Sequence, residues 1–179
     1  MPEQSGYVSD LNRLPPSISK MGTTETRVHD LDILHQEHRE LLRLTEAVME
    51  AAGEITPSFD KIAAARHALG QAGSRHVMNK LAIVTRALQD SADPWHRALG
   101  RRFTDELMAL RQSASEHYGT WTMARVKEDP REFRMAVRSQ YRALKARILW
   151  EEREVLPVVE KLLAASAPGT APGHAAGIR

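Results

Sequence analysis

Residues 31–52, LDILHQEHRELLRLTEAVMEAA, carry the pattern that most constrains the fold of this chain. Apolar and small residues recur there at alternating steps of three and four, which places them on one stripe of an α-helix. Glu37, Glu40 and other charged residues are expected on the opposite side. His38 falls inside the apolar stripe, and a buried imidazole needs partners for its ring nitrogens. The pattern predicts a core helix with a polar group in its middle.

Three further segments repeat apolar residues at helical spacing, namely residues 59–89, 94–127 and 130–165. No segment shows the strict alternation of a half-buried strand. Four long helices joined by short turns predict an all-α fold, an antiparallel up-down-up-down four-helix bundle. This bundle is expected to form one domain over residues 29–165.

Local signals mark where these helices begin. The first helix is expected to be capped by Thr26 or Asp30, and the second by Ser58. The Asp-Pro pairs at residues 93–94 and 129–130 each place a capping carboxylate before a proline at the first helical position. Short turns between the helices follow from these signals.

The buried stripes of the second and fourth helices contain charged residues. In the second helix the stripe is predicted to pass through His76, Lys80, Ile83 and Ala87; in the fourth it passes through Glu151, Val155, Val158 and Leu162. Pro157 should kink or locally open the fourth helix, because proline has no N–H to donate to residue 153. Gly70 and Gly73 indicate a kink or a close helix contact in the second helix.

Composition sets the broad class of the chain outside these helices. Residues 1–28 lack a sustained period and are expected to form a flexible arm, and residues 166–179 a disordered tail rich in proline, glycine and alanine. No apolar run reaches the roughly 20 residues that cross a bilayer, and no signal peptide is visible, so we expect a cytoplasmic protein. The absence of cysteine excludes disulfides and thiolate ligands. A net charge of only +2, with basic and acidic residues interleaved, disfavours nucleic acid as a partner.

Each predicted helix carries one conspicuous polar group on its stripe: His38, His76, Glu106 and Glu151. At about 1.5 Å per residue, His76 lies roughly 21 Å and Glu106 roughly 18 Å from the turn between their helices. The other pairs agree about equally well, so all four residues are expected in one layer. Two imidazoles and two carboxylates on facing helices are the kind of set that holds a metal in a bundle core.

Lys80 lies one turn beyond His76 on the same helix face. An ammonium group has no lone pair for a metal, and it would repel a metal cation and attract Glu106 and Glu151. The sequence therefore predicts either a metal layer of His38, His76, Glu106 and Glu151 or an ion-pair cluster around Lys80.

The segments EHRELLRL, residues 37–44, and EEREVLPVVEKLL, residues 151–163, resemble motifs of the hemerythrin-like family, also called HHE cation-binding domains. The resemblance covers roughly residues 31–163 and implies an antiparallel four-helix bundle that commonly holds a non-haem di-iron centre. It implies metal ligands at His38 and Glu151. The segment DPWHRALGRRFTDELMAL is similar to a subgroup with a third-helix glutamate, here Glu106.

Two positions depart from the family pattern. The family motif His-x-x-x-Glu in the second helix reads His76-Val-Met-Asn-Lys80 here, so lysine stands where the family has a glutamate ligand. Arg147 stands where the resemblance implies a histidine, four residues before Glu151. With two ligands replaced, an intact di-iron centre is disfavoured, and the resemblance implies either no metal or a single iron or other divalent ion.

These features give two hypotheses for function. The first is a non-catalytic regulatory or sensory protein of the cytoplasm with a degenerate metal centre. Its signal would come from protonation of the polar core, from a small ligand, or from a surface for a protein partner or homodimer. The second is a non-haem metal protein that binds iron, or O₂ through iron, using His38, His76, Glu106 and Glu151. An enzyme is disfavoured because no positioned nucleophile or base stands apart from the candidate ligands.

Overall fold

The computed structural model describes residues 23–166, and within this range the chain is helical with no strand. The helices are α1 (Thr23–Ala51), α2 (Phe59–Lys80), α3 (Arg86–Gln89), α4 (Pro94–Thr120), α5 (Met123–Glu128), α6 (Pro130–Trp150) and α7 (Leu156–Ala165). Two short π-helical segments, η1 (Leu81–Thr85) and η2 (Glu151–Val155), join α2 to α3 and α6 to α7 without a break. None of these helices combines the length and the apolar character that crossing a membrane requires.

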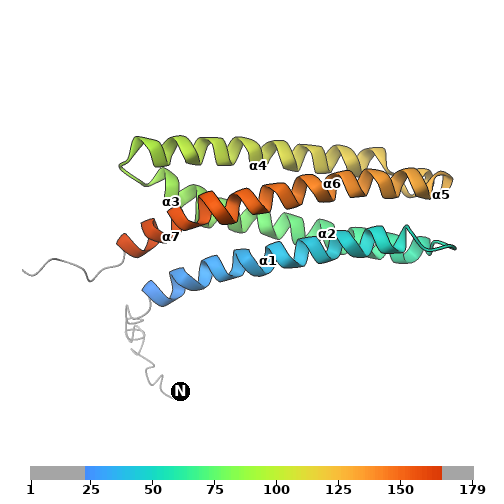
Figure 1. The fold of residues 1–179 in the computed structure, drawn as a ribbon, viewed down its shortest axis with the longest axis horizontal. Coiled ribbons are helices and arrows are strands. Elements are labelled where there is room, and N and C mark those ends of the chain that lie inside the picture. Colours follow the sequence, from blue (N-terminus) through green and yellow to red (C-terminus); the bar gives the residue numbers. More distant parts are fainter. Residues whose placement is uncertain (1–22, 167–179) are drawn as a thin grey trace, which may run out of the picture.

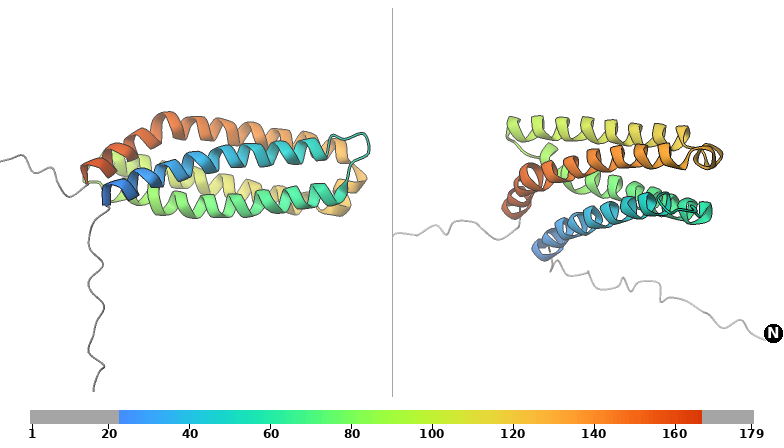
Figure 2. Two further views of the ribbon diagram at one scale, coloured as in Figure 1. Left: turned by 90° about the horizontal axis from the view of Figure 1, so that it is seen from below. Right: turned by 45° about the vertical axis from the view of Figure 1, so that its right-hand side comes forward.

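The described chain forms four long helical stretches that lie side by side (Figure 1). Helix α1 lies beside both α2 and α6, and α3 lies beside α4. The views in Figure 2 show the same arrangement, with the start of α1 and the end of α7 at one end of the molecule and α5 at the other. The predicted all-α class is thereby confirmed for residues 23–166.

The capping signals explain where most helices begin. Asp93 accepts a hydrogen bond from the backbone N–H of Trp95, and Asp129 accepts one from that of Glu132. In both cases proline occupies the first turn, where its missing N–H costs nothing. Ser58 accepts from the backbone N–H of Lys61, so the caps predicted for the second, third and fourth helices are confirmed.

Two helix ends differ from the prediction. Helix α1 begins at Thr23, so Thr26 and Asp30 lie within the helix instead of capping it. The third stretch is interrupted after Thr120, where Trp121 adopts φ −97° and ψ 68° before the cap of α5. This break turns Trp121 into the core at the α5 end, where it packs against Phe133. Residues 23–28, which were assigned to the arm, belong to α1. The rest of the predicted arm, and the tail after Ser166, lie outside the described residues.

The π-helical segments shift the buried stripe by one residue, because each wider turn accommodates one residue more than an α-helical turn. Beyond Lys80 the buried apolar residues are Val84 and Leu88, and Ile83 and Ala87, which were predicted on the buried stripe, are only partly buried. Beyond η2, Leu156 and Val159 are buried, whereas the predicted Val158 is only partly buried. The local opening expected before Pro157 takes the form of η2, which ends two residues ahead of that proline.

The apolar core falls into two large parts, separated along the bundle. One part lies towards the α7 end and includes Leu34, Val84, Phe103 and Val155. The other lies towards α5 and includes residues such as Trp121. Between them lies a small apolar group of Leu41, Leu44 and Ala72, next to a layer of buried polar residues. This polar layer is the candidate functional site.

Candidate functional site

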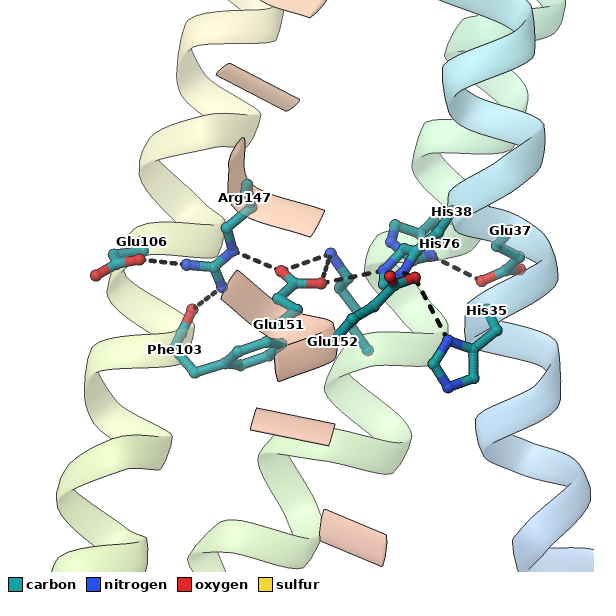
Figure 3. A network of polar contacts seen from close by, with 10 residues as sticks. His35, Glu37, His38, His76, Phe103, Glu106, Arg147, Glu151 and Glu152 are labelled. Atoms are coloured by element: carbon teal, nitrogen blue, oxygen red, sulfur yellow. Dashed lines mark hydrogen bonds and ion pairs between the residues drawn. The ribbon is translucent and has the colours of Figure 1, made fainter. Parts of the chain in front are cut away.

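Three of the four predicted ligands come together in this layer. His38, His76 and Glu151 are buried, and each offers one ligand atom so that these atoms all lie within 4.8 Å of one another. Glu106 does not join them: its side chain is 42% exposed and lies on the far side of Arg147 (Figure 3). The predicted four-residue layer therefore reduces to three residues, because the guanidinium group of Arg147 separates Glu106 from the interior.

Lys80 binds both oxygens of the Glu151 carboxylate. Its Nζ lies 2.8 Å from Oε1 and 2.6 Å from Oε2, and both residues are at most 1% exposed. Helix α2 brings Lys80 to this position one turn beyond His76, as its spacing predicts. An ammonium group enclosed in this way is stable only when a carboxylate compensates for the lost hydration.

Two further donors complete the coordination of Glu151. Arg147 Nε donates to Oε1 over 2.5 Å, and His38 Nε2 lies 3.1 Å from Oε2. Each carboxylate oxygen therefore receives two donors, which exhausts its strong acceptor directions. We call His38, Lys80, Arg147 and Glu151 the ion-pair cluster.

The protonation of the ion-pair cluster follows from burial and these contacts. Burial alone would raise the pKa of Glu151, but the hydrogen bond from His38 and the charges of Lys80 and Arg147 outweigh it and lower this pKa to about 2. Burial lowers the pKa of Lys80, an effect that its contact with Glu151 opposes. The geometry therefore fits an ionised pair within the core.

His38 has a carboxylate at each ring nitrogen. Its Nδ1 lies 2.9 Å from Oε1 of Glu152, opposite the contact of Nε2 with Glu151. The two carboxylates therefore fix the orientation of the His38 ring between them. Glu152 also lies 3.4 Å from Nδ1 of His35, at the edge of the layer (Figure 3).

His76 is bound differently from His38. Its Nδ1 lies 2.8 Å from Oε2 of Glu37, while no described residue forms a hydrogen bond with its buried Nε2. Burial first, and then the charges of Lys80 and His38, lower the pKa of His76 to about 2, so the ring is neutral near pH 7. With Glu37 accepting from Nδ1–H, the lone pair resides on Nε2.

Glu37 was predicted on the exposed side of the first helix, and this prediction is wrong. The residue is only 6% exposed because α2 covers it: Asn79 donates to its Oε1 over 2.7 Å, and Arg75 Nε lies 3.4 Å from the same oxygen. Glu152 is a second residue of the layer that the sequence did not single out. Both are acidic neighbours of a residue on the stripe, and only the partner helix decides that they turn inward.

Arg147 extends the polar layer from the core to the surface. Its guanidinium group contacts a carboxylate oxygen of Glu106 and donates over 3.1 Å to the carbonyl oxygen of Phe103. The guanidinium carbon lies 4.4 Å from the ring centroid of Trp150, which covers this side of the cluster. Glu106 in turn accepts from Arg102 at the surface over 2.7 Å.

The donor set does not fit a metal centre of two ions. The positive charges of Lys80 and Arg147 are already paired with the carboxylates of Glu106 and Glu151. A divalent cation would add uncompensated charge beside Lys80 and would have to displace the donors that occupy Glu151. Of the three clustered ligands, only His76 keeps a free donor atom, Nε2.

Comparison of the chain with protein-family models, with curated proteins and with solved structures gave no match.

Proposed function

We propose that this chain is a non-catalytic regulatory or sensory protein of the cytoplasm, built on a hemerythrin-like up-down-up-down bundle whose metal centre is replaced by the ion-pair cluster. The observation that carries this proposal is the enclosure of Lys80 against both oxygens of Glu151. The ammonium group occupies the space and the charge that a metal ion would need.

The side-by-side helices and the position of the polar layer support the hemerythrin-like part of the proposal. His38, His76 and Glu151 come from three different stretches and meet at one level, as in a bundle-core metal site. Lys80 and Arg147, which stand where the resemblance implies ligands, meet at the same level and bind the same carboxylate. The replacement of two ligands by two cations is thus a coherent change within one site.

The absence of a free reactive pair within the described cluster favours a binding role over catalysis. Its carboxylates and cations are engaged with one another, so no base is poised next to a nucleophile. In this proposal a protein partner or a second copy of the chain recognises the conformation of the bundle.

The test of this proposal is the iron content of the full-length protein, purified without chelator after growth with added iron. We expect folded, colourless protein with far less than one iron atom per chain. One or more iron atoms per chain, with visible absorbance, would overturn the metal-free proposal.

A reconstruction variant tests the hemerythrin-like ancestry of the site. The double variant Lys80→Glu/Arg147→His restores the residues that the resemblance implies, and we expect it to acquire iron. The matched control is Lys61→Glu, which changes an exposed lysine of the same helix and should leave the iron content unchanged. A folded double variant that acquires no iron would argue against the proposed scaffold.

A single-metal function is the second candidate, because the ligand atoms of His38, His76 and Glu151 already lie within 4.8 Å of one another and Nε2 of His76 is free. This function requires Lys80 to leave Glu151 when the ion binds. Tight binding of one Fe²⁺ or Zn²⁺ per chain by the unaltered protein, lost in His76→Gln, would favour it over the metal-free proposal.

A further inference from the structure

A second charged group lies buried far from the ion-pair cluster. Arg66 on α2 is only 8% exposed, yet no carboxylate among the described residues forms an ion pair with it. Ten residues separate it from His76, which corresponds to roughly 15 Å along the helix. Buried cations are normally paired with an anion, so the environment of Arg66 requires an explanation.

The present contacts of Arg66 are weak ones. Its Nη1 lies 3.6 Å from the sulfur atom of Met123, and its Nη2 lies 3.5 Å from the carbonyl oxygen of Tyr118. The guanidinium carbon also lies 4.7 Å from the ring centroid of Tyr118 and 5.5 Å from that of Phe133. Rings of this kind hold the guanidinium in place, but they do not neutralise its charge.

Arg66 lines an open hollow of about 290 Å³ near the α5 end of the molecule. Its walls come from α2, the end of α4, the turn after α4 and the first residue of α5. The lining residues besides Arg66 are Ala63, His67, Tyr118, Trp121, Thr122 and Met123. The walls are thus largely aromatic or apolar, and one guanidinium group supplies the charge.

The sequence builds this hollow through two local features. Gly70 allows the Tyr118 ring to approach α2, since a Cβ atom at Gly70 would lie 3.2 Å from the Tyr118 hydroxyl oxygen. That hydroxyl group donates to the backbone carbonyl of Arg66. The interruption after Thr120 then turns Trp121 beside the hollow. The break in the third helical stretch therefore helps to form the hollow.

The surrounding charges favour an anion. Burial first, and then the charge of Arg66, lower the pKa of the neighbouring His117. The guanidinium carbon of Arg125 lies 4.7 Å from the ring centroid of Trp121, which adds a second positive group near the hollow. A single buried guanidinium matches one negative charge better than two, and its planar fork matches a carboxylate.

We propose that the hollow at Arg66, Tyr118 and Trp121 binds a small organic monocarboxylate, whose carboxylate pairs with Arg66 and whose apolar body lies against Trp121 and Met123. This inference goes beyond the proposed function and stands on residues that the ion-pair cluster does not contain. It holds whether or not the polar layer binds a metal.

The experiment is an NMR titration of the full-length protein at pH 7 and constant ionic strength, with benzoate as the probe. We expect saturable shifts of the Trp121 indole N–H and the Arg66 Nε–H signals. Benzamide, which has the shape of benzoate without its charge, should produce much smaller shifts. Equal responses to benzoate and benzamide, or no saturable response to benzoate, would overturn the proposal.

Inorganic phosphate distinguishes a carboxylate site from a general oxyanion site. We expect phosphate to bind more weakly than benzoate, because phosphate has no apolar body to place against Ala63, Trp121 and Met123. Tighter binding of phosphate than of benzoate would overturn the assignment to a monocarboxylate.

Variants locate the binding site. Arg66→Met keeps an unbranched stem and removes the charge, so the apparent Kd for benzoate should rise roughly tenfold or more. The control Arg101→Met removes an exposed arginine of α4 and should leave the Kd unchanged. If Arg66→Met does not fold, Arg66→Lys keeps a charge but loses the planar fork, and weaker benzoate binding is again expected. Unchanged binding in a folded Arg66 variant would overturn the proposal.

Discussion

Lys80 shows how the type of a single residue can define a site. A glutamate at this position would add a ligand beside His76, whereas the lysine binds the carboxylate of Glu151 together with Arg147. The four-carbon stem of Lys80 is itself enclosed, so its ammonium group exchanges all of its hydration for protein contacts.

Removal of this ammonium group should weaken the protein. We expect Lys80→Ala to lower the free energy of unfolding by about 3 kcal/mol, because it leaves Glu151 with less compensation and opens a cavity. Urea denaturation followed by circular dichroism measures this change. Lys61→Ala, at a lysine side chain that is 66% exposed, should change the same quantity by no more than about 0.5 kcal/mol. Equal effects of the two substitutions would show that Lys80 has no special role in the core.

Single residues also mark the limit of what could be predicted. His38, His76 and Glu151 were recognisable because each interrupts an apolar stripe, and they do come together. Glu106 occupied a stripe position as well, but the arginine between it and the core holds it at the surface. Glu37 was predicted to be exposed and is buried. Its burial depends on Arg75 and Asn79 of another helix, which the period of its own helix does not reveal.

At the scale of elements, the helix boundaries were largely predictable and the phase of the stripes was not. Caps are local signals, so the stretches 59–89 and 130–165 match the prediction at both ends. The positions of the π-helical segments, in contrast, are not set by a local sequence signal. Ile83 and Val84 are both apolar, so the sequence suits either register, and the packing against α4 and α7 decides which residue is buried.

Two glycines within helices should respond in opposite ways to the same substitution. Nothing lies within 4 Å of a Cβ atom at Gly73, so Gly73→Ala should raise the free energy of unfolding by about 0.5–1 kcal/mol through helix propensity. At Gly100 a Cβ atom would lie 3.0 Å from Cβ of the buried Leu88.

In Gly100→Ala, crowding between α3 and α4 should outweigh the stabilisation from helix propensity. We therefore expect this substitution to lower the free energy of unfolding by about 1 kcal/mol, because the crowding forces the two helices apart. Thermal denaturation of the two variants side by side measures the difference. A stabilised Gly100→Ala would mean that these helices approach less closely than the structure indicates.

At the scale of the whole molecule, the buried polar layer links stability to pH. The folded pKa of His76 is lowered from 6.5 to about 2, and that of Glu151 from 4.5 to about 2. The unfolded chain therefore takes up protons on both groups at pH values where the folded protein does not, so stability decreases as the pH falls. His76 contributes to this loss below about pH 6.5, and Glu151 adds to it below about pH 4.5.

Between pH 6 and pH 5 the contribution of His76 to the slope should approach about 1.4 kcal/mol per pH unit. Urea denaturation of the unaltered protein and of His76→Gln across this range isolates that contribution. The variant should show the shallower slope. Identical slopes would contradict the assignment of His76 as a buried neutral ring.

The division of the apolar core by a polar layer bears on how the molecule opens. Hydrophobic contacts near α7 and near α5 are joined mainly by charged contacts and by the small group of Leu41, Leu44 and Ala72. Cooperativity along a bundle depends on continuous packing, so a polar boundary allows the two ends to exchange their amide protons as separate units. The end that contains α5, with its interrupted helix and open hollow, is then the part that exchanges first.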